Sequence, residues 1–315
     1  EFQLKMFLMF LLSFFFSWLC CLILIPLLRN YCLDEPSSRS SHLLPTPSGG
    51  GISFVIIGTL ISAFNSFYIP LLLLPLSLLG FIDDLIEIAP IWRYLVQSIT
   101  SLLLLFSNNS LITYLGSLPF LELIMYSGFI IFSCTAVINF VNFADGLDGL
   151  VSSCFLVILI AAAINNHMYL LPFIGALLGF LVLNWSPAKI FMGDVGSTFL
   201  GGLFFAIILN AASFVDSIGL LLVATPILAD CVICVIRRFG VGRSVFSPHK
   251  LHLYQRMNQS GLTHSQVSLL YLLATSFLAI AYLLFDFRIL LLSSSIVIII
   301  GAWCDKKIAK PFHHE

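Results

Sequence analysis

The sequence predicts an all-α fold, a polytopic bundle of about eleven transmembrane helices that forms one integral-membrane domain over residues 1–315. Three observations support this fold class. The chain is 60% hydrophobic and only 9% charged, and its mean hydropathy of +1.08 is far above that of a water-soluble domain. Apolar runs long enough to span a bilayer recur along the chain. Basic residues gather in alternate connections between these runs, as membrane topology requires.

Eleven apolar segments remain when the chain is divided at its polar loops. They cover residues 4–28, 50–67, 68–83, 93–107, 121–138, 149–165, 169–184, 197–214, 217–237, 267–285 and 288–304. The first is longer than the core of a signal peptide, and no small-residue cleavage pattern follows it, so we expect a retained helix. The stretch 107–120 is either a loop or a short re-entrant piece.

The basic residues predict the orientation of the bundle. If the first helix runs from outside to inside, twelve of the fourteen Lys and Arg residues fall on the inner side, and only Lys5 and Arg288 fall outside. The positive-inside rule then places the N-terminus outside and the C-terminus inside. All polar clusters emerge on the cytoplasmic side, where they would form an active-site cleft. This one-sidedness favours an enzyme with a soluble charged substrate over a transporter, whose site is expected near the membrane midplane.

The first polar cluster is the loop S-S-R-S-S-H-L-L-P-T-P-S-G-G-G at 37–51. Its prolines stiffen the backbone, and its glycines permit close approach at the entry to the second helix. Arg39 and His42 offer donors to an anionic group. A lone arginine at a membrane interface is also a common topology anchor.

Asp83 and Asp84 end the third apolar segment at the cytoplasmic edge. Neighbouring side chains on a helix point about 100° apart, so the two carboxylates cannot serve the same atom. One would face the site as a base or a metal-associated group, while the other would hold neighbouring backbone or a cation. A solvated helix end is the alternative interpretation.

The stretch N-F-V-N-F-A-D-G-L-D-G-L at 139–150 is unusually polar for its apolar surroundings, where unpaired polar groups cost several kcal/mol. Its polar residues recur every three positions, at Asn139, Asn142, Asp145 and Asp148. A glycine follows each aspartate, which predicts that the helix ends near Ala144 and that the chain turns so that all four side chains converge. Oxygens of Asn and Asp without thiolate or imidazole favour a hard cation such as Mg²⁺.

The segment N-W-S-P-A-K-I-F-M-G-D-V-G-S at 184–197 adds Lys189 and Asp194 on the same side. The next helix is expected to begin near Ser197, so that its first amides would present a partly positive end to an anion. Charged residues in this apolar setting indicate function more than structure.

The connection at 238–266 is basic and contains S-P-H-K-L-H-L-Y-Q-R. His249 and His252 lie three residues apart, so one helical face would present two imidazoles to a diphosphate or, less favourably, form a zinc half-site that lacks further ligands. Arg256 belongs to the same loop. A basic inner loop is also explained by topology or by contact with anionic lipid.

Two features lie in the helix before this loop. Asp230 is an acid within an apolar segment and is therefore a site candidate. Cys231 and Cys234 have the C-x-x-C spacing of a redox or zinc pair, but the sequence holds no second such pair, and a packing role is favoured. The eight cysteines predict no disulfide framework.

Taken in order, H-x-x-P-T-P-x-x-G-G, D-D, N-x-x-N-x-x-D-G-x-D-G-L, P-A-K-x-F-M-G-D-x-G-S and the histidine-containing loop resemble the motifs of the polyprenyl-phosphate N-acetylhexosamine-1-phosphate transferases. This family, of the glycosyltransferase 4 type, includes bacterial enzymes that begin O-antigen, enterobacterial common antigen and teichoic acid linkage synthesis, and the phospho-MurNAc-pentapeptide translocase. The resemblance extends from about Arg29 to Arg256. It implies transfer of a sugar-1-phosphate from a UDP-sugar to undecaprenyl phosphate, with release of UMP and with Mg²⁺, or Mn²⁺ in its place, as cofactor.

The resemblance also implies residue roles by motif position. Asp194 and Asn142 would hold the metal. Asp83, Asp84 and Asp194 would be catalytic, with Asp83 as the base or the partner of the lipid phosphate. Substrate contacts are implied for Arg39, His42, Asn139, Asp145, Asp148, Lys189, His249, His252 and Arg256. Among these, the two aspartates would line the nucleotide side and the two later histidines would bind the diphosphate.

Two departures from the family pattern bear on the sugar. Ser48 follows P-T-P where many relatives carry a basic residue, and the late loop reads H-K-L-H-L-Y-Q instead of ending in H-x-H-H. The loop is more similar to the O-antigen branch that accepts N-acetylated 6-deoxyhexoses such as FucNAc or QuiNAc. Expected partners are a UDP-N-acetylhexosamine, undecaprenyl phosphate and the bilayer of a bacterial cytoplasmic membrane, with no nucleic acid. A homodimer is compatible with the sequence.

A membrane transporter or flippase for a polar solute or a lipid-linked sugar is the competing hypothesis. Asp230 and broken helices favour it, but it predicts ionisable residues deep in several helices. A CDP-alcohol phosphotransferase is excluded because its long D-G-x-x-A-R pattern is absent from the sequence.

Overall fold

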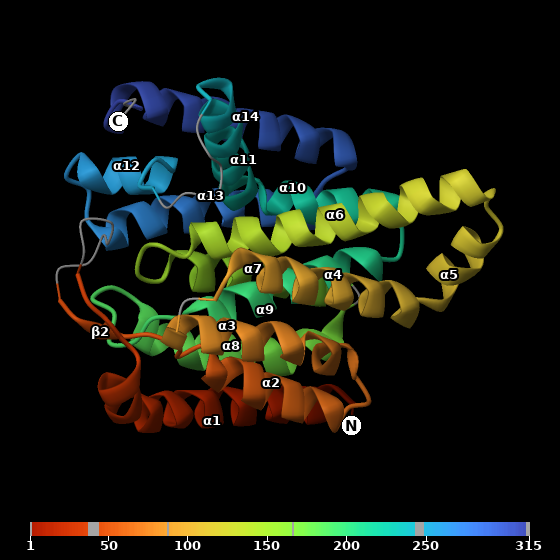
Figure 1. The fold of residues 1–315 in the computed structure, drawn as a ribbon, viewed down its shortest axis with the longest axis horizontal. Coiled ribbons are helices and arrows are strands. Elements are labelled where there is room, and N and C mark those ends of the chain that lie inside the picture. The colour runs from red at the N-terminus through yellow and green to blue at the C-terminus, as the bar shows by residue number, and fades with distance from the viewer. Residues whose placement is uncertain (1, 37–43, 87, 166, 243–248, 313–315) are drawn as a thin grey trace.

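The computed structural model describes residues 2–36, 44–86, 88–165, 167–242 and 249–312. Within them the protein is all-α, as predicted, and most of its long helices lie side by side in one bundle (Figure 1). The first half of the chain forms α1 (Phe2–Tyr31), α2 (Ile52–Ala63), α3 (Leu74–Ile86), α4 (Pro90–Ser107), α5 (Asn109–Gly116), α6 (Phe120–Ala144) and α7 (Leu150–Ile164).

The second half forms α8 (Leu171–Asn184), α9 (Asp194–Leu209), α10 (Phe214–Val223), α11 (Thr225–Gly240), α12 (Leu253–Gln259), α13 (His264–Leu284) and α14 (Phe287–Lys307). A small antiparallel sheet, which the sequence did not predict, joins β1 (Leu33–Asp34) to β2 (Thr46–Pro47). It pairs Leu33 with Pro47 and thereby ties the end of α1 to the chain entering α2.

Each of the eleven apolar segments contains helix, and the protein is a multi-pass membrane protein. Five helices are long and apolar enough to cross a bilayer alone: Leu4–Tyr31, Ile69–Ile86, Phe120–Ala144, His264–Leu284 and Phe287–Lys307. Two bent pairs raise the number to as many as seven, and the other apolar helices are shorter. The count of eleven spans and the predicted orientation stay predictions.

The bends fall at breaks between neighbouring helices. Part of the stretch 107–120 is helical, since it forms α5, which turns 91° away from α4. The second bend, of 77°, separates α10 from α11. Figure 1 shows α11 standing across the direction of the other helices.

The core lies around α9, whose side chains are buried along nearly its whole length. Helix α9 contacts α3 and α6, while α1 packs against α8. The outer helices α1, α6, α13 and α14 expose many large apolar side chains. Such a surface suits contact with lipid. Lipid tails are as apolar as these side chains, so the hydrophobic effect does not drive the side chains into the protein interior. The core therefore lies between short helices, and the long ones face outward.

The polar loops gather at one end of the bundle. Strands β1 and β2, the turn after α6, the connection before α9 and helix α12 all lie there (Figure 1). Helix α1 begins at the other end, and α14 ends at the polar one. Segments far apart in the sequence therefore bring their polar side chains together.

Candidate active site

The turn predicted at 145–149 is confirmed. Helix α6 ends at Ala144, Asp145 leaves the helical conformation with φ −83° and ψ 59°, and its amide donates to the carbonyl of Asn142 at 3.1 Å. Gly149 then takes a left-handed conformation, with φ +71°, before α7 begins. Glycine adopts this conformation without the steric cost that a Cβ would bring. The chain thus reverses within five residues and directs its polar side chains to one place.

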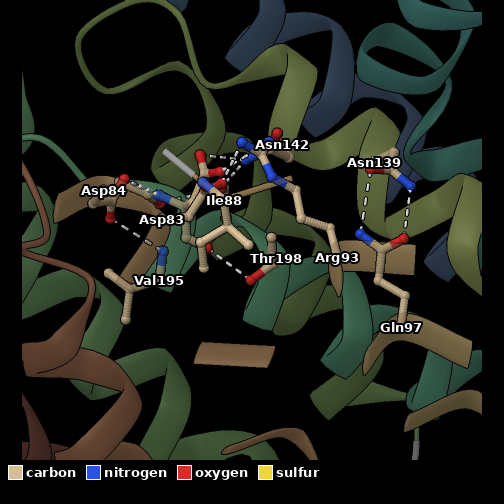
Figure 2. A network of polar contacts seen from close by, with 12 residues as sticks. Asp83, Asp84, Ile88, Arg93, Gln97, Asn139, Asn142, Val195 and Thr198 are labelled. Atoms are coloured by element: carbon tan, nitrogen blue, oxygen red, sulfur yellow. Dashed lines mark hydrogen bonds and ion pairs between the residues drawn. The ribbon is translucent and has the colours of Figure 1, made fainter. Parts of the chain in front are cut away.

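Three of the four polar residues of this stretch line one cavity of about 270 Å³, which we call the acidic cavity. They are Asn142, Asp145 and Asp148. Asn139 does not join them. It exchanges hydrogen bonds of 2.9 and 3.3 Å with Gln97 of α4 (Figure 2). The predicted convergence therefore holds for three of the four residues.

The acidic cavity is lined by carboxylates from four separate parts of the chain. They belong to Asp34, Asp84, Asp145, Asp148 and Asp194, and the lining also includes Ser48, Asn184, Gln255 and His264. Among the described residues, no lysine or arginine lines it. A cavity with this lining attracts cations and repels anions. An anionic substrate would therefore need a cation to accompany it.

Asp194 lines the acidic cavity and also takes part in a network of hydrogen bonds and ion pairs with Asn142 and Arg93. Asn142 donates through Nδ2 to Asp194 Oδ1 at 2.8 Å and contacts Ser197 Oγ at 2.9 Å. The other carboxylate oxygen lies 3.6 Å from Arg93 Nη1. The predicted proximity of Asn142 and Asp194 is thus present as a direct hydrogen bond.

Asp83 is held on the other side of this network. Its Oδ1 accepts from the amide of Ile88 at 2.6 Å, and its Oδ2 lies 2.5 Å from Arg93 Nη2. Arg93 of α4 therefore bridges Asp83, near the end of α3, and Asp194, at the start of α9. Figure 2 shows its side chain beside Asp83. The sequence indicated Arg93 only as one of the inner basic residues, so this bridging role is new.

Asp84 points elsewhere than Asp83, as the helix geometry predicted. Its carboxylate accepts from the amides of Asp194 at 3.0 Å and Val195 at 3.4 Å (Figure 2). Helix α9 begins at Asp194, three residues before the predicted start near Ser197. The expectation that its first amides face a substrate anion is therefore wrong for the two that Asp84 occupies. A carboxylate at this position accepts hydrogen bonds from amides that have no partner within the helix. It also interacts favourably with the positive N-terminal end of the α9 dipole.

Gly193 permits the close contact between α3 and α9. Its φ is +73°, and a Cβ placed there would lie 2.3 Å from Asp84 Oδ2 and 2.8 Å from the amide nitrogen of Gly49. A side chain at this position would be strained and would also displace the carboxylate that caps α9.

We expect Gly193→Ala to destabilise the fold by about 2–4 kcal/mol, from backbone strain and a weakened helix cap. Chemical unfolding of the protein in detergent micelles measures this. The matched control is Gly128→Ala in α6, where a Cβ meets nothing within 4 Å and stability should stay equal or rise by about 1 kcal/mol. Equal stability of Gly193→Ala and wild type would contradict the tight fit.

Asp148 is fixed by groups that the sequence did not connect to it. Its Oδ1 lies 3.0 Å from His264 Nδ1, and its Oδ2 accepts from the amide of Ala188 at 3.1 Å. Burial alone would raise the pKa of Asp148, but these hydrogen bonds and the charge of His264 lower it below its ordinary value. Asp148 is thus held ionised, and His264 is a site residue that sequence analysis missed.

Asp145 behaves in the opposite way. Burial, followed by the nearby charges of Asp194 and Asp148, raises the pKa of Asp145 to about 7. The two aspartates of the D-G-x-D-G motif therefore differ in charge near neutral pH. Burial is the main physical reason for the raised pKa of Asp145, and the neighbouring carboxylates add to it.

Other predicted site residues lie outside the acidic cavity. Lys189 is exposed and does not line it. Arg256 is 3% exposed; it pairs with Asp305 and donates to the carbonyls of Leu251 and Lys310, beside an apolar cavity of about 450 Å³ between α11, α13 and α14. Arg39 and His42 fall outside the described residues.

The two later histidines also lie away from the acidic cavity. They do not share a helical face as expected, because α12 begins only at Leu253. Their rings stack with 5.0 Å between centroids. Asp230 of α11 accepts from the amides of Leu253 and Tyr254 and from the hydroxyl of Tyr271, so it anchors the start of α12.

Comparison with known proteins gives the fold and site a family context. Residues 66–212 match the model of glycosyl transferase family 4. The chain is 30% identical to a phospho-N-acetylmuramoyl-pentapeptide-transferase of Carboxydothermus hydrogenoformans, over 84% of this chain and 94% of the relative. It is 30% identical to a decaprenyl-phosphate N-acetylglucosaminephosphotransferase of Mycobacterium leprae, over 77% and 74%.

A third relative is a probable undecaprenyl-phosphate N-acetylglucosaminyl 1-phosphate transferase of Bacillus subtilis, 28% identical over 84% of this chain and 82% of the relative. The matched region contains the ends of α3 and α6 and the start of α9, which meet at the acidic cavity. The chain therefore belongs to glycosyl transferase family 4.

Proposed function

We propose that this protein transfers an N-acetylhexosamine-1-phosphate from a UDP-sugar to a polyprenyl phosphate. An oxygen of the lipid phosphate attacks the phosphorus next to the sugar, the bond from that phosphorus to UMP breaks, and UMP leaves. The product is a lipid-diphosphate-linked sugar. The single observation that carries this proposal is the acidic cavity at one end of a membrane bundle, with Asp194 hydrogen-bonded to Asn142 at its edge.

The relatives support the reaction class. Their names describe transfer of a phosphosugar, and two of them name a polyprenyl phosphate in the reaction. The site lies at one end of a bundle whose helices are long and apolar enough to cross a membrane, which would let it meet a lipid acceptor and a soluble donor. We further propose undecaprenyl phosphate as the lipid, and a bacterial cytoplasmic membrane with the cavity facing the cytoplasm.

The donor set of the acidic cavity fits Mg²⁺. Carboxylate and amide oxygens are the ligands that a hard cation prefers, and Mn²⁺ accepts the same set. Burial and then the charges of Asp194 and Asp148 raise the pKa of Asp145, and a bound cation would offset the repulsion between these carboxylates. Asp194 and Asn142 would hold the ion, which when bound neutralises phosphate charge and stabilises the charge that develops on transfer.

The residues around this ion would have different roles. Arg93, placed between Asp83 and Asp194, can meet the lipid phosphate while Asp83 accepts a proton or orients the acceptor. Asp84 acts as a positioning residue, because its carboxylate holds the first amides of α9 and so fixes Asp194. Asp145 and Asp148 would line the nucleotide side.

The remaining assignments follow from the family resemblance. Arg39, His42 and Lys189 are proposed contacts to substrate phosphates, Asn139 supports the site through Gln97, and Arg256 holds the loop that carries α12. The sugar is proposed to be FucNAc, QuiNAc or a related N-acetylhexosamine, as the first sugar of a surface glycan such as O-antigen. His249 and His252, which the resemblance implies as diphosphate ligands, do not line the acidic cavity.

The test is UMP release by purified protein with undecaprenyl phosphate and Mg²⁺. The donor panel contains UDP-GlcNAc, UDP-FucNAc and UDP-QuiNAc, each measured with and without the lipid. We expect lipid-dependent UMP release with one of them and a lipid-diphosphate sugar in mass spectrometry. Failure of the whole panel to release UMP would refute the proposal. A phosphorylated Asp83 trapped without acceptor would show a covalent route instead of direct attack.

The pKa of Asp145 predicts how Mg²⁺ dependence changes with pH. Below a pKa of about 7, Asp145 is protonated and the acidic cavity loses one negative charge; above it, the carboxylate is ionised and attracts the cation. Lowering the pH from about 8 to about 6 should therefore raise the Mg²⁺ concentration for half-maximal UMP release about tenfold.

Titrations of Mg²⁺ at several pH values measure this effect. The control is Asp145→Asn, which removes this titration and should show a clearly smaller change in the Mg²⁺ requirement; the change that remains comes from carboxylates such as Asp194, whose pKa burial raises to about 6. The interpretation is wrong if the wild-type requirement changes no more than that of Asp145→Asn.

A further inference from the structure

The structure joins two features that are separate in the sequence. The C-x-x-C pair of α11 and the two histidines before α12 meet at one point. Ligand atoms of Cys234, His249 and His252 all lie within 4.8 Å of one another. The thiol of Cys231 lies one helical turn before Cys234 and interacts with the same His252 ring. Each half alone lacked partners, and the fold supplies them.

His252 is the best-defined member of this group. It is 3% exposed, and its Nδ1 is buried without a hydrogen-bond partner. Asp230 Oδ1 lies 3.8 Å from this nitrogen. A carboxylate behind one ring nitrogen is the arrangement that commonly orients a metal-binding histidine, and it leaves Nε2 of His252 for a metal ion.

The other members of this group differ in their exposure to solvent. His249 is half-buried, and its Nδ1 accepts from the amide of Leu251 at 3.3 Å, which leaves Nε2 for another partner. Cys231 and Cys234 are 0% and 3% exposed. An ion could therefore enter from the side of His249 and reach thiols that are otherwise enclosed.

We propose that Cys234, His249 and His252, with Cys231 as fourth ligand, form a binding site for a thiophilic divalent metal ion such as Zn²⁺. Thiolate and imidazole ligands in a tetrahedral set favour Zn²⁺ over Mg²⁺. From Zn–S and Zn–N bond lengths, tetrahedral ligand atoms lie about 3.3–3.8 Å apart. Side-chain adjustments of about an ångström would bring Cys234, His249 and His252 to this spacing, and Cys231 would exchange the hydrogen bond that its thiol donates to the carbonyl of Phe140 at 3.2 Å for the ion. Binding displaces the two thiol protons and the extra proton of His252 where that imidazole is charged, so that two thiolates offset the charge of the ion.

The position of this site suggests what the ion does. It joins α11 to the chain entering α12, where the amides of Leu253 and Tyr254 bind Asp230. Tyr254 in turn donates to the carbonyl of Phe143 at the end of α6 at 2.8 Å, and Gln255 lines the acidic cavity. The ion would act as a structural clamp that holds α12 against the active site. It is distinct from the Mg²⁺ site, because none of its ligands lines the acidic cavity.

The experiment uses the full chain purified in detergent. Bound Zn²⁺ is measured by mass spectrometry of the metal after dialysis, and the ion is then replaced by Co²⁺. We expect about one Zn²⁺ per chain, and a Co²⁺ spectrum with thiolate-to-metal charge transfer and tetrahedral ligand-field bands. A Co²⁺ spectrum without thiolate bands would overturn the site, and this measurement needs no variant.

Variants identify the ligands. Cys234→Ser and His252→Gln should lose retained Zn²⁺, and Cys231→Ser should lose the greater part of it; full retention in any of them overturns that residue's assignment. Cys304→Ser is the matched control and should retain Zn²⁺. His313 and His314 near the chain end can also bind metal, so a variant with both replaced by alanine is included and should retain it too.

A chelator strong enough to remove the ion should lower the unfolding temperature of wild type and leave that of Cys234→Ser unchanged. An equal effect on both proteins would overturn the clamp. UMP release is measured separately on the same preparations, so failure of the metal site and failure of the proposed transfer are distinguished.

Discussion

Asp194→Asn is expected to lower UMP release by about 10³-fold, the loss usual when a preorganised charge is removed from a catalytic site. Asparagine has nearly the same shape, so the fold should persist. The change removes the charge that Arg93 faces at 3.6 Å and that would hold the metal ion. It also places one amide against the Nδ2 group of Asn142, which now donates to Asp194 at 2.8 Å.

The measurement compares the initial rates of UMP release at saturating Mg²⁺. Asp286→Asn is the matched control, because this aspartate caps α14 through the amides of Arg288 and Ile289, and asparagine caps helices equally well. Its activity should equal that of wild type. The central role given to Asp194 would be wrong if Asp194→Asn stayed within about tenfold of wild type.

The local parts of the site could be predicted from the sequence. Glycine after each aspartate of 145–149 indicated the turn, and α6 ends at Ala144 as expected. The helical rotation between neighbouring residues predicted that Asp83 and Asp84 serve different partners, and they do. These features depend on a few consecutive residues, so backbone geometry alone decides them.

The missed features depend on contacts between distant segments. Helix α9 starts earlier than expected because its cap comes from Asp84, 110 residues before it. His264 stands alone at the start of an apolar helix, and only the folded chain brings it to Asp148. No periodicity or motif carries such information, since the partner lies in another part of the sequence.

The structure of the late basic loop, 238–266, could not be predicted from the sequence for the same reason. Three-residue spacing suggested that His249 and His252 share a helical face, yet α12 begins after them and Asp230 holds its first amides. Without a helix, the rings turn toward α11 instead of the acidic cavity. The sequence favours a packing role for the C-x-x-C pair, because it holds no second such pair. Tertiary structure brings the two histidines to Cys234 of this pair.

Arg93→Ala is expected to reduce UMP release by about 10²-fold, because one residue joins two acids of the site. Its guanidinium lies 2.5 Å from Asp83 and 3.6 Å from Asp194. Removing it leaves Asp83, whose side chain is 4% exposed, without its cation. Part of the loss should appear as a higher KM for the lipid phosphate, since an anionic acceptor approaching nearby carboxylates would lose the guanidinium that offsets their charge.

Arg93→Lys separates charge from geometry. An ammonium group keeps the charge but cannot reach both acids in the forked manner of a guanidinium, so its activity should fall between alanine and wild type. Arg237→Ala is the matched control: its side chain has the same 39% exposure and pairs with Asp305 at 2.8 Å, away from the acidic cavity. Rates for the control should be close to wild type. Equal losses in Arg93→Ala and Arg237→Ala would mean that basic residues at this membrane edge act through general charge, and the bridging role of Arg93 would be rejected.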